Sequence, residues 1–319
     1  MPENGQVAPD PGEQIRLAKL ADQLGFGPLM IHDVPLNSAD YSDPVGHLDP
    51  RVLLGAVAAN TERIGLLSGA VVLPLRHPLH VAKGAVSVSA LSRGRFVLGL
   101  GTGPSCRVRR VGPEYRGTAA APCASLGATG RSSRPSLPRH CRRGAAECAG
   151  VSSAAAVART GSAAGCRFWE LSLEWIARHA IGWMTYHREP AALSDRHRPW
   201  RAAVARAAPG EFRTFAVGMH LELCANGHAT PSTIPGGHRT GYRGLIERLS
   251  GMRAAGVEHI ALNLMPTSRK PQEVLRELAD RVLPCLRAER QTDRREWYCG
   301  IYCTNVDYTS TLIFTSRQE

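Results

Sequence analysis

The stretch that decides the fold is RIGLLSGAVVLPLRHPLHVAKGAVSVSALSRGRFVLGLGTG, residues 63–103. Its first part, Ile64 to Leu73, is a nearly continuous aliphatic run, as expected of a strand buried on both faces. From His77 to Leu91 apolar residues recur at spacings of three and four, which predicts an amphipathic helix. Arg95 to Leu100 is a second apolar run. The stretch therefore predicts two parallel strands joined by a right-handed helical crossover.

The flanking sequence extends this alternation. Apolar spacing predicts a helix over 13–24, a short strand over 29–31, and a helix that begins at Pro50 behind an Asp49 cap. Beyond residue 171, strands near residues 183, 212 and 257 alternate with helices, and 225–240 is expected to be a glycine- and proline-rich loop. The pattern indicates an α/β protein, a (β/α)8 TIM-type barrel. Its first and fifth strands are doubtful, so we expect an incomplete barrel.

Residues 104–168 differ from everything around them. They are rich in Arg, Ala and Ser and hold 11 arginines, no lysine and two acidic residues, and so most of the net charge of +12. Two interpretations stay open: a genuine disordered insertion, or an out-of-frame segment. We expect one barrel over 1–287 that contains this segment, followed by a tail, 288–319. The tail sequence suits a strand, but it has no evident partner.

Composition limits the possible functions. The nine cysteines show no metal-ligand spacing, and neither a signal peptide nor an apolar run long enough to span a bilayer is found. We therefore expect a reduced, cytoplasmic protein with no membrane partner and no metal. Because the basic residues concentrate in 104–168 rather than on a helix face, we expect no nucleic-acid partner either. Oligomeric state stays open.

Ligands of such barrels bind at the carboxyl ends of the strands. Here those ends carry His32 and Asp33, Ser68–Ala70, Gly101–Gly103, Tyr186 and His187, and Asn263. Ser172 is either a plain helix cap or part of a phosphate site made by free backbone N–H groups. The glycines at 99, 101 and 103 lack the final glycine and the acidic residue of a dinucleotide fingerprint, so a Rossmann fold is disfavoured.

Several longer motifs resemble the bacterial luciferase-like flavin monooxygenases. They are DVPL (33–36), TERIGL (61–66), VVLPLRHPLHVAK (71–83), LSRGRFVLGLGTG (91–103) and SLEWIARHAIGWMTY (172–186). The resemblance covers about 13–103 and 171–287. It implies a TIM barrel that uses reduced FMN and dioxygen on a small organic substrate, with a deazaflavin coenzyme as the alternative cofactor found in sister groups. It also implies a separate flavin reductase as a partner.

The resemblance assigns roles to individual residues. Ser68, Gly69 and Ala70 would back the flavin ring, where relatives carry an unusual cis peptide. Thr102 and Gly103 would line the ring edge, and Ser172 would contact the phosphate. His32, at a strand end, is the candidate catalytic residue, as a donor of a hydrogen bond or proton to the cofactor adduct.

The sequence also departs from the family pattern. Gly103 is followed by Pro-Ser-Cys in place of an Asp-Arg-Pro motif, and Ile181 replaces the usual Asp before Gly-Trp. Two functions therefore stay open at this point. One is an active flavin-dependent monooxygenase, and the other is a non-catalytic homologue that binds no cofactor.

Overall fold

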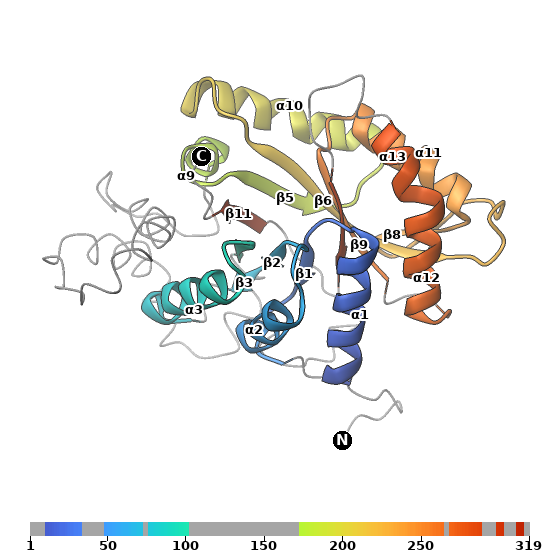
Figure 1. The fold of residues 1–319 in the computed structure, drawn as a ribbon. Coiled ribbons are helices and arrows are strands. Elements are labelled where there is room, and N and C mark those ends of the chain that lie inside the picture. Colours follow the sequence, from blue (N-terminus) through green and yellow to red (C-terminus); the bar gives the residue numbers. More distant parts are fainter. Residues whose placement is uncertain are drawn as a thin grey trace, which may run out of the picture.

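The computed structural model describes residues 10–33, 48–72, 76–101, 172–264, 268–288, 298–302 and 311–315 (Figure 1). The described helices are α1 (Pro11–Leu24), α2 (Pro50–Asn60), α3 (Pro78–Leu91), α9 (Leu173–His179), α10 (Pro190–Ala207), α11 (Tyr242–Ala254), α12 (Pro271–Glu277) and α13 (Leu283–Ala288). The strands are β1 (Leu29–Ile31), β2 (Leu66–Ser68), β3 (Val71–Val72), β4 (Phe96–Gly101), β5 (Gly182–Tyr186), β6 (Thr214–Leu223), β7 (Ser232–Ile234), β8 (Gly237–Thr240), β9 (His259–Asn263), β10 (Tyr298–Tyr302) and β11 (Thr311–Thr315). Segment 104–168 lies outside the described residues.

The strand–helix–strand unit expected over 63–103 is confirmed. β2 and β4 pair in parallel, and α3 connects them. The strand expected over Ile64 to Leu73 is present as two short pieces, β2 and β3, and the Gly69–Ala70 peptide bond between them is cis. Local capping explains the helix starts: Asp10 accepts hydrogen bonds from the N–H groups of Gly12 and Glu13, and Asp49 accepts one from Arg51.

The sheet consists of two arcs. The first arc, β1–β2–β4, comes from residues before 102, and the second arc, β5–β6–β9, comes from residues after 171. All pairings within each arc are parallel. Helices pack outside both arcs, with α1, α2 and α3 beside the first and α9, α10 and α11 beside the second (Figure 1).

Two strands of the 288–319 tail join the arcs. β10 lies between β1 and β9 and is parallel to both. β11 lies between β4 and β5 and is antiparallel to both. Together these pairings connect β1, β2, β4, β11, β5, β6, β9 and β10 into a ring.

The α/β barrel class is therefore confirmed. The expected first strand before residue 13 is not found among the described residues, where α1 is the first element. The places of the first and fifth strands are taken by β10 and β11, which gives the tail the pairing partners that sequence patterns could not identify.

The apolar core has two layers. The larger layer lies between the ring and the helices and includes Leu54, Phe215 and Trp200, all fully or almost fully buried. The smaller layer lies inside the ring and consists of Met30, Leu67, Met184, Ala216 and Ala261. Burial on both faces accounts for the near-continuous apolar character of these strands.

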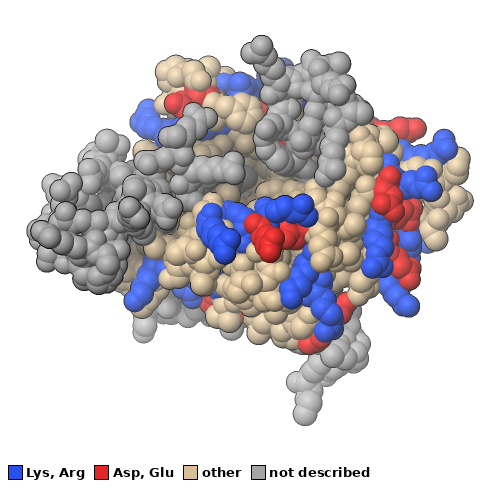
Figure 2. All heavy atoms as spheres, viewed as in Figure 1, with Lys and Arg blue, Asp and Glu red and all other residues tan. Residues whose placement is uncertain are grey.

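On the face shown in Figure 2, acidic and basic side chains of the described residues lie interspersed. Among the described helices, none is both long and apolar enough to cross a lipid bilayer.

Candidate functional site

The end of the ring at which the strands finish carries small and polar residues. Side chains alternate along a strand, so the residues two positions after the inner apolar layer face the same interior, one layer nearer the strand ends. This upper layer consists of His32, Gly69, Gly99, Tyr186, Gly218 and Asn263. Three of its six residues are glycines without side chains, the layer beneath is apolar, and His32, Tyr186 and Asn263 supply hydrogen-bonding groups.

His32 follows β1 directly and is 3% exposed. Its position two residues after Met30 places it in the upper layer, as expected of a candidate catalytic residue at a strand end. The structure thus brings His32 and Gly69 to the same end of the first arc.

Asp33, the next residue, has a structural role. Its carboxylate accepts hydrogen bonds from Val72 N at 3.1 Å and from Arg76 Nε at 2.7 Å. Arg76 also reaches Asp49 at 3.1 Å. Hydrogen bonds from Arg51, helped by the charge of Arg76 and opposed by burial, lower the pKa of Asp49 to about 2. The Asp33–Arg76–Asp49 network therefore fixes the end of β1 against the start of α3.

Ser68 and Gly69 are also engaged within the protein. The Ser68 hydroxyl donates to Gly99 O at 3.1 Å and accepts from Gly99 N at 2.9 Å, which ties β2 to β4. A Cβ atom at Gly69 would lie 2.0 Å from Met30 Sδ, so the observed conformation of Met30 requires glycine at this position. Ser68, Gly69 and Ala70 thus offer a closely packed surface of small residues rather than free polar side chains.

The other three residues predicted to bind the cofactor are Thr102, Gly103 and Ser172. Thr102 and Gly103 lie outside the described residues. Ser172 is the N-cap of α9, and its hydroxyl accepts a hydrogen bond from Trp175 N at 3.2 Å. The first turn of α9 also carries Glu174, paired with Arg206, so a carboxylate already lies at this helix end. The phosphate role of Ser172 stays a prediction.

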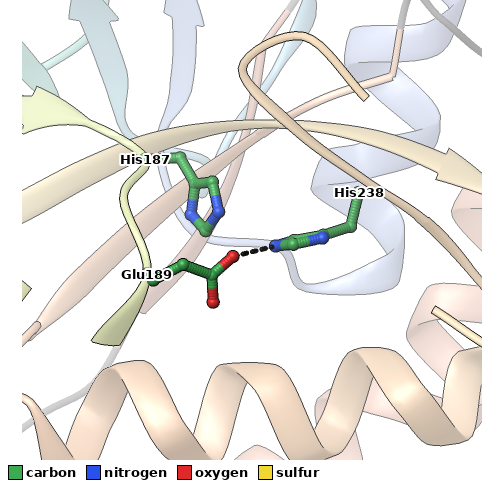
Figure 3. Close-up of side chains that lie close together, drawn as sticks. All are labelled: His187, Glu189 and His238. Atoms are coloured by element: carbon green, nitrogen blue, oxygen red, sulfur yellow. Dashed lines mark ion pairs between the residues drawn. The ribbon is translucent and has the colours of Figure 1, made fainter. Parts of the chain in front are cut away.

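A second polar cluster lies at the end of the second arc and consists of His187, Glu189 and His238. His187 follows β5, Glu189 precedes α10, and His238 is on β8. One ligand atom from each residue lies within 4.8 Å of the others. Figure 3 shows the three side chains pointing toward one another.

Sequence analysis placed His187 at a strand end but missed Glu189 and His238. His238 was missed because 225–240 is not the expected loop: it contains the β7–β8 hairpin, turned at Pro235 and Gly236, and the φ of Gly236 is 73°. The signal was present in STIPGGHRT, where β-branched and polar residues flank a Pro-Gly turn.

A pocket of about 340 Å³ lies at the opposite end of the second arc, where α10 ends and the chain approaches β6. Arg201, Gly210, Glu211 and Phe212 contribute to its lining. Because ligands of TIM-type barrels bind at the carboxyl ends of the strands, this pocket is not the candidate site.

Comparison with known proteins identifies the N-terminal part of the chain. Residues 1–121 match the family model described as luciferase-like monooxygenase. The chain is 35% identical over 99 residues to 4-hydroxyprotoasukamycin monooxygenase from Streptomyces nodosus subsp. asukaensis, a match that covers 30% of this chain and 25% of that protein. It is 34% identical over 101 residues to N-acetyl-S-alkylcysteine monooxygenase from Bacillus subtilis (strain 168), covering 31% of this chain and 29% of that protein. The chain thus spans about a quarter of the length of these curated relatives.

Similarity in fold extends over most of the chain. The structure of coenzyme F420-dependent tetrahydromethanopterin reductase from Methanopyrus kandleri superposes with a TM-score of 0.57 at 13% identity, over 86% of this chain and 95% of that one. At this identity the likeness shows the fold alone. The sequence matches are confined to the N-terminal part of the chain, where residues 1–121 are similar to the luciferase-like monooxygenase family.

Proposed function

We propose that this chain is an oxidoreductase that binds a flavin-type cofactor, FMN or a deazaflavin, at the carboxyl end of the ring and acts on a small organic substrate. The observation that carries the proposal is the upper layer, where His32 and Gly69 lie above the apolar floor of Met30 and Leu67. The names of the curated relatives, both monooxygenases, favour oxygen insertion as the reaction.

The residues of the first arc fit a flat ring. Gly69 and Ala70 have no bulky side chain, and the Ser68 hydroxyl is occupied by Gly99, so this surface presents backbone and small groups. Such a surface allows close approach over an area of apolar contact. In the proposed complex, Thr102, Gly103 and Ser172 would complete the site, as the family resemblance implies.

When bound and reduced, a flavin supplies the electrons that activate dioxygen toward the substrate. The protein has to orient the ring, exclude water and control protons. His32 is suited to the last role, because its imidazole is buried in the upper layer and can donate a proton or hydrogen bond at the cofactor edge. The apolar floor beneath it excludes water from that side.

Equilibrium binding tests the proposal. Purified chain is titrated with FMN and, separately, with a deazaflavin coenzyme, and ligand fluorescence is followed. We expect saturable one-to-one binding of one of them in the micromolar range. A dissociation constant above about 1 mM for both, equivalent to less than about 4 kcal/mol of binding free energy, would instead support the non-catalytic homologue.

The variant His32→Gln separates binding from chemistry. Because His32 is assigned a proton or hydrogen-bond role and not the main contact with the ring, we expect the dissociation constant to change less than about threefold. Turnover of the bound reduced cofactor should slow by about 100-fold or more, the usual contribution of a positioned acid or base. Equal loss of binding and turnover would show that His32 acts only through the packing of the site.

A further inference from the structure

We propose that His187, Glu189 and His238 form a binding site for a divalent transition-metal ion of the zinc type. The site goes beyond the proposed function, because it uses none of the residues assigned to the flavin. The three side chains converge from the end of β5, the start of α10 and strand β8 (Figure 3).

Backbone pairing holds the two imidazoles in place. His187 N donates to Gly218 O at 2.9 Å, which anchors the residue to β6. His238 is in register with Leu221 of the same strand. The imidazole rings meet edge to face, with centroids 4.7 Å apart. Both histidines are therefore positioned by β6 before any ion binds.

The histidines carry buried nitrogen atoms without a hydrogen-bond partner of good geometry. These are both ring nitrogens of His238, which is fully buried, and Nδ1 of His187, which is 9% exposed. Leaving a buried polar atom unsatisfied costs free energy, and such an atom calls for an explanation. A metal ion bound by both rings would satisfy one nitrogen of each.

The charge state of the cluster suits metal binding. Burial lowers the pKa of His187 to about 4, with His238, Arg248 and Arg188 acting in the same direction and Glu189 opposing them. Burial and Arg248 also lower the pKa of His238, although Glu189 and the Ser232 backbone oppose this. In both residues burial opposes protonation, and the neutral imidazole is the form that coordinates metals.

Glu189 completes the ligand set from the solvent side. Its side chain is 62% exposed, and Oε1 lies 3.9 Å from His238 Nε2, while Oε2 faces Arg248 Nη1 at 3.4 Å. One carboxylate oxygen is thus directed at the histidines and the other at a cation. The exposed carboxylate offers an entry path, and water can fill the remaining coordination positions.

The chemistry of the ligands selects the ion. Two imidazoles and a carboxylate are suited to Zn²⁺ and similar first-row ions rather than to Ca²⁺ or Mg²⁺. Ligand atoms of a tetrahedral zinc ion lie about 3.3 Å apart, as its bond lengths of about 2.0–2.2 Å require. The three ligand atoms lie within 4.8 Å of one another, so a shift of at most about 1.5 Å in any pair closes the site. The exposed Glu189 carboxylate, 3.9 Å from His238 Nε2, is free to make its part of that shift.

The test is titration of the full-length chain with Co²⁺, followed by its visible absorption, and with Zn²⁺, followed by calorimetry. We expect one equivalent to bind without the strong near-ultraviolet band that cysteine thiolates give with Co²⁺. His187→Ala and His238→Ala should each weaken this binding by about 100-fold or more, since even changes to groups that only support a ligand cost about 10–100-fold. Glu189→Gln should weaken it by about 10-fold.

The matched control is His228→Ala, which removes an exposed histidine from the connection between β6 and β7. It should bind Co²⁺ like the wild type. Glu189→Gln guards against misfolding as an explanation, because the side chain is mostly exposed. Absence of binding, a thiolate spectrum, or equal binding by wild type, Glu189→Gln and the histidine variants would overturn the proposal.

Discussion

The two arcs of the ring differ in the kind of polar side chain that is buried beside them. In the first arc, the carboxylate of Asp22 accepts hydrogen bonds from the N–H groups of Glu62, Arg63 and Ile64. Although burial opposes it, these bonds lower the pKa of Asp22. Arg95 likewise donates to Ala58 O, Thr61 O and Ile64 O at the end of α2.

The second arc also has a buried carboxylate, Glu258, which accepts a hydrogen bond from Phe215 N, but three buried imidazoles lie beside this arc where, among the described residues, the first arc has His32 alone. His187, His238 and His259 each have at least one buried nitrogen without a hydrogen-bond partner of good geometry. Charged groups with partners stay charged and hold strand ends together, whereas the buried neutral imidazoles resist protonation, so that acid favours the unfolded chain. The comparison predicts that the first arc tolerates mild acid and that the second arc responds to it.

The largest expected effect concerns the strands that join the arcs. A chain truncated after Ala288 loses β10 and β11, and with them the pairings of five residues with β9 and five with β4. At about 1 kcal/mol for each net hydrogen bond, the loss is comparable to a whole domain's stability of about 5–15 kcal/mol.

We expect the truncated chain to show no cooperative thermal transition in calorimetry. A chain that ends after Thr315 retains both strands and serves as the control. If truncation after Ala288 left the unfolding midpoint unchanged, the arcs would not depend on the tail strands.

A smaller effect is expected within the first arc. Asp33→Asn leaves the Arg76 guanidinium, 19% exposed, without its main anionic partner. Breaking a buried pair in this way costs about 3–5 kcal/mol, as measured by urea denaturation. The control Asp195→Asn breaks an exposed pair with Arg198 and should cost less than about 1 kcal/mol. Equal costs for the two variants would remove the distinction between anchored and surface pairs.

The second arc is tested by pH. Burial lowers the pKa of His259 to about 4 from 6.5, so the folded chain resists a proton that the unfolded chain accepts. His259 therefore contributes no penalty above pH 6.5, and stability falls as the pH drops from 6.5 to 4, by about 1.4 kcal/mol for each pH unit.

The variant His259→Gln cannot be protonated and should remove up to about 3 kcal/mol of this pH dependence. Unfolding free energies measured by urea at pH 8 and at pH 4.5 give the comparison. A variant with the same pH dependence as the wild type would show that His259 is not held neutral.

Sequence patterns predicted the strands of the two arcs but not that β10 and β11 join the arcs into a ring. The β2–α3–β4 unit could be predicted because its strands, its helix and the turns between them are consecutive in the chain. The parallel pairing of β2 with β4 then follows from the usual right-handed crossover of a strand–helix–strand unit. β10 pairs with β1 and β9, elements far away in sequence, and no local pattern encodes such a choice. An antiparallel β11 between parallel strands is likewise set by tertiary packing.

The candidate sites were predictable to a different degree. His32 and His187 were found because each follows an apolar strand, and strand ends are where barrels bind ligands. His238 was missed because its hairpin was interpreted as a loop. The engagement of Asp33 by Arg76 and of Ser68 by Gly99 depends on side-chain contacts across strands, which composition and spacing do not report.

The smallest expected effect concerns Ser172. Loss of its N-cap hydrogen bond in Ser172→Ala should cost about 1 kcal/mol of stability. If the residue also contacts a phosphate, the variant weakens binding of FMN but not of riboflavin, and fluorescence titration with both ligands measures this. Equal affinities of wild type and variant for FMN would leave Ser172 with the capping role alone.

The most direct test of the proposed function is to locate the flavin-binding site. Amide hydrogen exchange is measured by mass spectrometry with and without saturating FMN or deazaflavin, whichever binds. We predict slower exchange over 29–33 and 66–72, at the upper layer of the first arc, and no change over 201–212 at the opposite end of the ring. Protection confined to 201–212, where Arg201 and Phe212 line the other pocket, would contradict the proposed site.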